Sequence, residues 1–316
     1  MRLAIINDYQ NLALASADWS GLPPDVALTV HGRVEDADQA AALLGDCEVV
    51  VTSREETRFD AALLERLPKL RLLVTHGMAN AALDLPALAA RGVTVCGTGY
   101  GFTGATVELA WGLILGLTKL IPQEDAAIRA GEWGAGLGRG LTGRTLAVLG
   151  LGDLGGQVAR VGLAFGMRVI AWSPNLAEAR CREIGAELVS RERLFAEADV
   201  LSIHVKLSAR SRGMVGRAEL ALMKPEALLI NTARGPVVDE AALVEALRER
   251  RIAGAGLDVF DQEPLPQGHP LRGLPNTLLT SHIGGRTREN FIARYRDCLE
   301  DVLAWLAGKP IRVLKG

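Results

Sequence analysis

The fold is decided by one stretch, Thr145-Leu-Ala-Val-Leu-Gly150-Leu-Gly152-Asp-Leu-Gly155-Gly-Gln-Val-Ala159. The apolar run 146–149 predicts a fully buried strand. Three glycines at G-x-G-x-x-G spacing follow it and lead directly into a helical pattern of apolar residues between 154 and 163. The stretch therefore predicts a strand, a tight turn and a helix.

Such a turn is typical of a pyrophosphate-binding site. Gly150 would permit the sharp turn, Gly152 would let the backbone approach the phosphates, and Gly155 would let the helix pack close to the strand. The positive end of the helix would face the anion. A glycine-rich turn that binds nothing is the alternative, but the strand before it and the helix after it favour binding.

Length and composition narrow the class of protein. A chain of 316 residues predicts two domains, and 49% hydrophobic residues with a net charge of −2 indicate a folded chain with no basic excess for nucleic acid or a membrane surface. The N-terminal apolar stretch is too short for a signal peptide, and the run 109–117 is too short to span a bilayer and predicts a buried helix.

The cysteines predict free buried thiols rather than disulfides or a metal site. No C-x-x-C pair is present, and no histidine stands at metal-ligand spacing. We therefore expect no metal and a cytoplasmic location. The four cysteines are Cys47, Cys96, Cys181 and Cys298.

Strands and helices alternate along the first 75 residues, which predicts a parallel sheet covered by helices. Expected strands are 3–6, 27–30, 48–52 and 70–75, and expected helices are 36–44 and 60–67. The loops 52–57 and 75–80 should lie at the carboxyl edge of this sheet, where ligands bind.

A second α/β unit is predicted after a glycine-rich stretch at 97–104, which is either a hinge or an ordinary surface loop. A helical region at 106–131 should kink or break at Pro122. Further strands are expected at 168–172, 199–203, 227–231, 253–257 and 277–280, and helices at 239–250 and 287–306. The pattern of the last helix does not indicate where it packs.

The residue that usually holds the ribose of a dinucleotide is absent. The strand 168–172 ends in Ser173-Pro174-Asn175, where a carboxylate for the 2′-hydroxyl is usual. The arginine that usually accepts a 2′-phosphate is absent too, and Arg180 is the nearest candidate. The choice between NAD and NADP is therefore open.

Three strand ends in the second half carry groups that could do chemistry. Arg234 follows one strand, Glu263 the next and His282 a third, so a cation, a carboxylate and an imidazole lie at one edge of one sheet. Each alone is more simply a surface or loop residue. Their joint occurrence downstream of a nucleotide-binding turn indicates a site.

Several motifs occur in a characteristic order: Gly150-x-Gly152-x-x-Gly155, His204-Val-Lys-Leu207, Leu222-Met-Lys224, Asn231-Thr-Ala-Arg234-Gly235-x-x-Val238-Asp239-Glu240, Asp258-Val-Phe-x-x-Glu263-Pro264 and His282-Ile-Gly-Gly. Over nearly its full length the sequence resembles the D-isomer-specific 2-hydroxyacid dehydrogenase family. The resemblance implies an enzyme that interconverts a 2-keto acid and a D-2-hydroxy acid with NAD or NADP.

The resemblance also implies roles for the reactive residues. His282 would be the acid in reduction and the base in oxidation, and Glu263 would favour its imidazolium form and hold the ring. Arg234 would grip the substrate carboxylate and polarise the carbonyl. Backbone N–H groups of Gly77, Met78 and Ala79 would complete the carboxylate site.

The implied fold is two doubly wound parallel-sheet α/β domains. A discontinuous, flavodoxin-like substrate domain would comprise residues 1–99 plus 287–316, and a Rossmann nucleotide-binding domain residues 100–286, with hinges near Gly99 and Gly285. Family members are commonly homodimers, which would place the helical region 107–121 at an interface, although its apolar face could equally be internal core. The implied cofactor contacts are Thr106, Gly150, Gly152, Asp153, Leu154, Gly155, Ser173, His204, Val205, Thr232, Ala233, Asp258, His282 and Gly284.

Departures from the family pattern leave alternatives. Lys206 stands where proline is usual, Ser281 also replaces a proline, and His76 lies in the substrate loop. If His76 and Lys206 face the cleft, we expect a substrate more anionic than lactate. A phosphoglycerate-type dehydrogenase and an NAD-sensing, corepressor-like binding module are the competing functions, and the retained catalytic candidates argue against the second.

Overall fold

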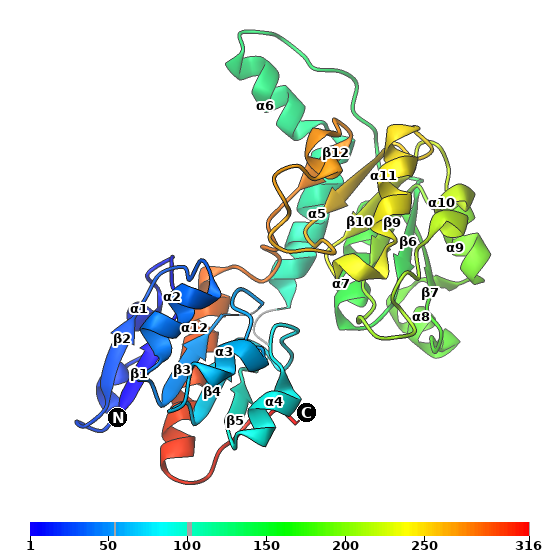
Figure 1. The fold of residues 1–316 in the computed structure, drawn as a ribbon. Coiled ribbons are helices and arrows are strands. Elements are labelled where there is room, and N and C mark those ends of the chain that lie inside the picture. Colours follow the sequence, from blue (N-terminus) through cyan, green and yellow to red (C-terminus); the bar gives the residue numbers. More distant parts are fainter. Residues whose placement is uncertain (54, 100–102, 316) are drawn as a thin grey trace. The chain divides into compact units, whose positions relative to one another are not determined.

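The computed structural model describes residues 1–53, 55–99 and 103–315 (Figure 1). The chain forms two compact units, residues 1–102 with 287–316 and residues 103–286. The expected boundary after residue 99 falls beside residues 100–102, which lie outside the described residues, as does part of the hinge candidate at 97–104.

The first unit is built on an all-parallel sheet in the order β2-β1-β3-β4-β5. Its strands are β1 Arg2–Ile5, β2 Ala27–Val30, β3 Val49–Thr52, β4 Leu72–Thr75 and β5 Thr94–Gly97. One face packs against α2 Ala37–Leu44, α3 Ala61–Glu65 and α4 Leu85–Ala90, and the other against α1 Ala13–Ser16 and α12 Arg288–Leu306. A short 3-10 turn, η1 Trp19–Gly21, follows α1.

The second unit holds a larger parallel sheet in the order β12-β11-β10-β9-β6-β7-β8. Its strands are β6 Thr145–Leu149, β7 Arg168–Trp172, β8 Glu187–Leu188, β9 Val200–Ile203, β10 Leu228–Asn231, β11 Gly254–Leu257 and β12 Thr277–Leu279. The helices on one face are α5 Gly104–Thr118, α7 Asp153–Ala164 and α8 Glu178–Ile184, and those on the other are α9 Arg191–Glu197, α10 Arg217–Leu222 and α11 Glu240–Arg248. The 3-10 turns η2 Gly235–Val237 and η3 Pro270–Gly273 lie in its loops.

Side chains of β6 show why both faces of this sheet are covered. Leu146 and Val148 point into one apolar cluster, and Ala147 and Leu149 into the opposite one. Alternation puts successive side chains on opposite faces, so an all-apolar strand needs helices on both sides. The strand order reverses between β6 and β9, the position at which doubly wound sheets bind ligands.

The expected fold class is confirmed. Every strand expected from the sequence is present, with ends within two residues of the prediction. Two strands were missed, β5, whose last residue belongs to the glycine-rich stretch, and β8, which has only two residues.

The predicted break at Pro122 is also confirmed. Helix α5 ends at Thr118, Leu120 adopts a left-handed φ of 57°, and α6 (Ile121–Arg129) starts with the proline in its first turn. Among the described residues no single helix is long and apolar enough to cross a membrane; α5 and α6 meet that test only together, bent by 60°. Residues 107–121 were expected either at a dimer interface or in the internal core. Most apolar residues of α5 are buried against the sheet, so α5 forms part of the core.

Helix α12 returns to the first unit, where it packs against α1, β4 and β5. In Figure 1 its orange and red ribbon lies along the sheet of blue and cyan strands. Tyr295 is 1% exposed, and its hydroxyl donates to Oδ1 of Asp8 at 3.1 Å. The N–H groups of Leu12 and Ala13 donate to the same carboxylate, which ties the last helix to the loop after β1.

Candidate active site

The glycine turn after β6 is tightly packed on two sides and open on a third. A Cβ on Gly150, whose φ is 98°, would lie 2.9 Å from the backbone of His204, and one on Gly155 would lie 2.0 Å from the carbonyl oxygen of Gly150. A Cβ on Gly152 would meet no atom within 4 Å. Two glycines therefore allow the backbones to pack, and the third leaves open backbone at the start of α7.

The surroundings of this turn fit a dinucleotide. Asp153 and Leu154 begin α7, and no side chain among the described residues caps it, so its first N–H groups can receive an anion. Thr232, after β10, is 7% exposed, and its hydroxyl has no hydrogen-bond partner among the described residues. Three features that could bind a dinucleotide therefore lie at the carboxyl edge of one sheet. They are the open backbone at Gly152, the uncapped start of α7 and the unpaired hydroxyl of Thr232.

His204 and Val205 follow β9 and pack against the first glycine. Nε2 of His204 lies 2.8 Å from the hydroxyl oxygen of Ser202. Burial lowers the pKa of His204 to about 4, so the ring is neutral at pH 7. The backbone of His204 packs on the turn, and its neutral ring adds no charge beside it.

The loop that carries His282 is fixed by the carboxylate of Asp258 at the end of β11. His282 has a left-handed φ of 54°, which is uncommon outside glycine. Asp258 accepts hydrogen bonds from the Thr280 hydroxyl at 2.6 Å and from the N–H groups of residues 283 and 284 at 2.7 and 2.9 Å. The hydroxyl of Thr106 donates to the carbonyl oxygen of Gly284 at 3.0 Å. These bonds hold the histidine in its strained conformation.

His282 and Glu263 form a short hydrogen bond, with 2.6 Å between Nδ1 and Oε2. The other oxygen of Glu263 accepts from the N–H of Phe260 at 2.9 Å. Burial opposes ionisation of this carboxyl, but the bond from His282, the Phe260 N–H and the charge of Arg234 outweigh it and hold the pKa of Glu263 below its ordinary value. The carboxylate orients the ring and leaves Nε2 for an external partner.

Arg234 is brought to this pair by the turn after β10. The side chain of Asn231 accepts from the N–H of Ala233 and donates to the carbonyl oxygen of Arg234, both at 3.0 Å. A Cβ on the next residue, Gly235, would lie 2.0 Å from the backbone of Phe260, so the two loops are in direct backbone contact. The structure thus brings together the three residues that the sequence predicted for chemistry.

In the first unit, Gly77, Met78 and Ala79 follow β4. Gly77 has a φ of 84°, and its N–H donates to the Thr98 hydroxyl at 2.7 Å. None of the described residues accepts a hydrogen bond from the N–H of Met78 or Ala79. Two of the three expected backbone donors are therefore available, and the third shapes the loop.

The condition set for His76, that its ring faces the cleft, is not met in the first unit. His76 is 2% exposed, and its ring centroid lies 5.9 Å from that of Phe291 and 5.0 Å from that of Tyr295, both on α12. Burial, together with the charge of Arg294, lowers the pKa of His76 to about 3. A neutral core ring supplies no cation, which removes the argument from His76 for a more anionic substrate. Lys206 is exposed.

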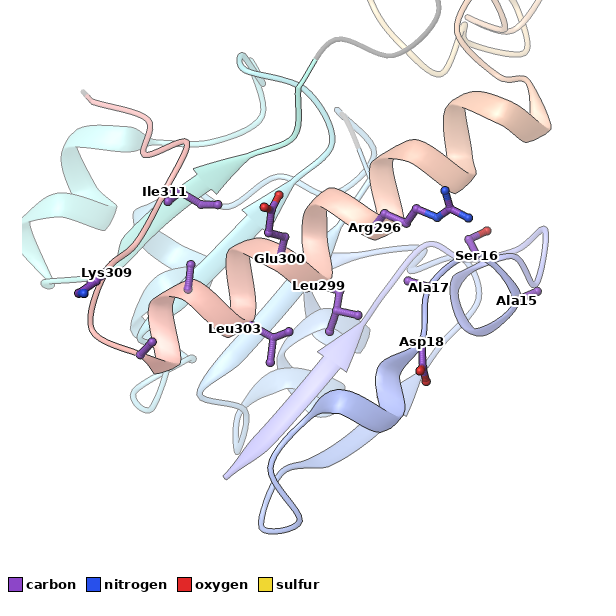
Figure 2. Close-up of a pocket in the computed structure, with 12 residues that line it drawn as sticks. Ala15, Ser16, Ala17, Asp18, Arg296, Leu299, Glu300, Leu303, Lys309 and Ile311 are labelled. Atoms are coloured by element: carbon purple, nitrogen blue, oxygen red, sulfur yellow. The ribbon is translucent and has the colours of Figure 1, made fainter.

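A groove of about 930 Å³ lies elsewhere in the first unit, between residues 15–18 and α12 (Figure 2). Leu299, Leu303 and Ile311 line it with apolar side chains, and Asp18 and Arg296 line it with charged ones. It contains none of the residues predicted for a site.

Sequence reasoning missed the way the His282 loop is held. The family resemblance implied Asp258 as a cofactor contact, and Thr280 was not singled out. The bonds join positions 22 to 26 residues apart, and no local pattern marks such a pairing.

Comparison with known proteins gives one family. Residues 111–284 match the family model described as D-isomer specific 2-hydroxyacid dehydrogenase, NAD binding domain. A glyoxylate reductase from Aeropyrum pernix is 37% identical over 97% of this chain and 90% of that protein. A D-3-phosphoglycerate dehydrogenase from Archaeoglobus fulgidus is 34% identical over 83% of this chain, which spans 50% of that protein.

Solved structures agree with this result. A phosphoglycerate oxidoreductase from Vibrio cholerae superposes with a TM-score of 0.90 at 34% identity, over 98% of this chain and 99% of that one. The apo D-lactate dehydrogenase from Escherichia coli gives a TM-score of 0.87 at 26% identity, over 99% and 100%.

Replacing Asp258 by asparagine should loosen the His282 loop. An amide cannot accept all three donors, and each buried donor left unpaired costs about 1–3 kcal/mol. We expect faster backbone hydrogen exchange in residues 280–285, measured by mass spectrometry. Asp261→Asn, an exposed carboxylate three residues along the same loop, is the control. Unchanged protection in Asp258→Asn would contradict the clamp.

Proposed function

Because this chain belongs to the D-isomer-specific 2-hydroxyacid dehydrogenase family, we propose that His282, Glu263 and Arg234 carry out its nicotinamide-dependent interconversion of a 2-keto acid and a D-2-hydroxy acid. The observation that carries this proposal is the 2.6 Å hydrogen bond between His282 and Glu263. It lies beside Arg234 and at the same sheet edge as the glycine turn. A nicotinamide bound at that edge supplies or accepts the hydride.

His282 is the proton donor in reduction and the acceptor in oxidation. Hydride addition to a ketone builds negative charge on the carbonyl oxygen, which must be neutralised as it forms. With Nδ1 bonded to Glu263, the protonated ring can give the proton on Nε2 to that oxygen. The ionised Glu263 stabilises the ring charge and fixes the ring plane.

Arg234 binds the substrate carboxylate and polarises the carbonyl. A guanidinium offers two parallel N–H donors that match a carboxylate, which a lysine ammonium cannot do. The N–H groups of Met78 and Ala79 are further donors for the same carboxylate, and Gly77 shapes their loop.

The remaining predicted contacts belong to the cofactor. Gly150, Gly152 and Gly155 with the start of α7 take the pyrophosphate, and Thr232 offers its unpaired hydroxyl. Asp258 and Thr106 act through the His282 loop that they hold. The other proposed contacts are Asp153, Leu154, Ser173, His204, Val205, Ala233 and Gly284.

The substrate is a small 2-keto acid of the glyoxylate and hydroxypyruvate class. The relative from Aeropyrum pernix, named glyoxylate reductase, aligns over nearly the whole of both chains. The second candidate is a phosphorylated hydroxypyruvate, favoured by the relatives named D-3-phosphoglycerate dehydrogenase. Initial rates with glyoxylate, hydroxypyruvate, pyruvate and phosphohydroxypyruvate separate the two, and no turnover of any of them would contradict the proposal.

The enzyme works in the cytoplasm as a homodimer. All four cysteines are free, as is usual for proteins in a reducing compartment.

The proposed dimer surface lies on α6 and the segment after it. Figure 1 shows α6 extending away from the sheet of its own unit. On α6 and the segment after it, Ile121, Ile128, Trp133 and Leu137 are 54%, 51%, 94% and 97% exposed, and large apolar side chains so exposed mark an association surface.

His282→Ala should lower kcat by about 10²–10⁴-fold while dissociation constants for the cofactor change little. Stopped-flow rates and cofactor fluorescence titrations measure the two effects. His269→Ala is a matched control, because His269 also pairs with a carboxylate, Glu240, at 2.9 Å in the same unit. Undiminished turnover in His282→Ala would remove it from the mechanism.

Glu263→Gln should move the pH dependence of reduction toward acid, because the amide carries no charge beside the ring. Reduction needs a protonated ring, and the ionised carboxylate of Glu263 stabilises that form whereas a neutral amide does not. The rate should therefore fall off at a lower pH in the variant than in the wild type. A kcat profile between pH 5 and pH 10 measures this, and superimposable profiles would count against the coupling.

Charged residues on the exposed segment should dissociate the dimer. Trp133→Asp combined with Leu137→Asp should reduce the mass in solution from twice 33.6 kDa to 33.6 kDa by light scattering. Leu14→Asp, at a residue 60% exposed in the first unit, should leave the mass unchanged. A double variant that stays dimeric would place the interface elsewhere.

A further inference from the structure

The end of β7 lies directly beside the glycine turn. The N–H of Gly150 donates to the carbonyl oxygen of Trp172 at 3.0 Å, so the turn and Ser173 leave the sheet side by side. NAD-binding sites usually place a carboxylate at this strand end for the 2′-hydroxyl of the adenosine ribose. Here Ser173, Pro174 and Asn175 offer a hydroxyl and an amide in its place.

A guanidinium rests on the same turn. Arg180, in the first turn of α8, donates from Nε to the carbonyl oxygen of Leu151 at 3.2 Å and from Nη2 to that of Gly152 at 3.4 Å. Gly156 makes room for it, because a Cβ there would lie 3.0 Å from Nη2. The glycine after the G-x-G-x-x-G pattern thus lets an arginine from the next helix lie across the dinucleotide turn.

Two arginines lie beside one carboxylate near the turn. Nη1 of Arg180 lies 2.8 Å from both carboxylate oxygens of Glu183, and Nη2 of Arg160 lies 3.6 Å from one of them. Two arginines therefore share one carboxylate. Glu183 is 57% exposed, and such exposed ion pairs are weak enough for a bound dianion to displace the carboxylate.

We propose that Arg180 makes this enzyme select the dinucleotide that carries a 2′-phosphate, NADP, over NAD. The proposal rests on the proposed dinucleotide site at the glycine turn. A guanidinium pairs with phosphate through parallel N–H groups, and the hydroxyl of Ser173 and the amide of Asn175 are further donors. Residues 173–175 at the strand end carry no carboxylate that would repel the phosphate.

The test is binding of two nucleotides that differ only in the 2′-phosphate, adenosine 2′,5′-bisphosphate and adenosine 5′-monophosphate. Isothermal titration calorimetry on the full chain needs no turnover. We expect the wild type to bind the bisphosphate at least about tenfold more tightly, since a charge-assisted hydrogen bond corresponds to a factor of that size. Arg180→Ala should remove the difference, and Arg180→Lys should restore part of it.

Arg160→Ala is the matched control. It removes the same charge beside the same Glu183, but among the described residues Arg160 makes no hydrogen bond to the turn. It should keep most of the preference. Equal loss in both variants would mean that net charge, and not Arg180, selects the cofactor, and would overturn the proposal.

Ser173→Asp tests the same idea from the other side. A carboxylate at the strand end should weaken NADPH binding by about tenfold or more and leave NADH binding unchanged or tighter, measured by fluorescence titration. If the wild type binds NADH more tightly than NADPH, the inference about Arg180 fails while the dinucleotide site stands. If neither binds, the proposed site at the glycine turn fails as well.

Discussion

The carboxylate of Asp258, 1% exposed, is the interaction on which the candidate active site depends. A buried charge is tolerated only where donors replace the lost water, and here all three donors come from the loop 280–284. One side chain at the end of β11 therefore sets the direction of His282 after β12. Hydrogen bonds on both sides of the loop offset the cost of a left-handed histidine and bring Nδ1 to Glu263.

Glycine fixes the spacing of the loops along this sheet edge. Two loops meet a neighbour backbone to backbone, at Gly150 with His204 and at Gly235 with Phe260, and within the glycine turn Gly155 packs on Gly150. A side chain at any of these positions would overlap the neighbouring backbone, which would have to shift. The short bond between His282 and Glu263 and the nearness of Arg234 therefore depend on residues that take no part in the chemistry.

The sequence was informative wherever one segment carried the whole signal. Apolar runs predicted the long strands, the G-x-G-x-x-G pattern predicted the turn, and Pro122 predicted the break between α5 and α6. It failed where a residue's surroundings come from distant segments. His76 follows a strand, and the sequence left its role open; its ring packs against Phe291 and Tyr295 of a helix more than 200 residues further on. The packing of that helix could not be derived from its own periodicity.

Burial also decides which histidine can exchange a proton. Of the three histidines singled out from the sequence, His76 and His204 lie in apolar surroundings that lower the pKa to about 3 and about 4, so both rings are neutral through the physiological range. Only the third, His282, is bonded to a carboxylate, and its side chain is 26% exposed. A group that transfers a proton must be stable in both protonation states and must be reachable. Glu263 supplies the first condition and the partial exposure of the ring the second, which is why the chemistry is assigned to this imidazole.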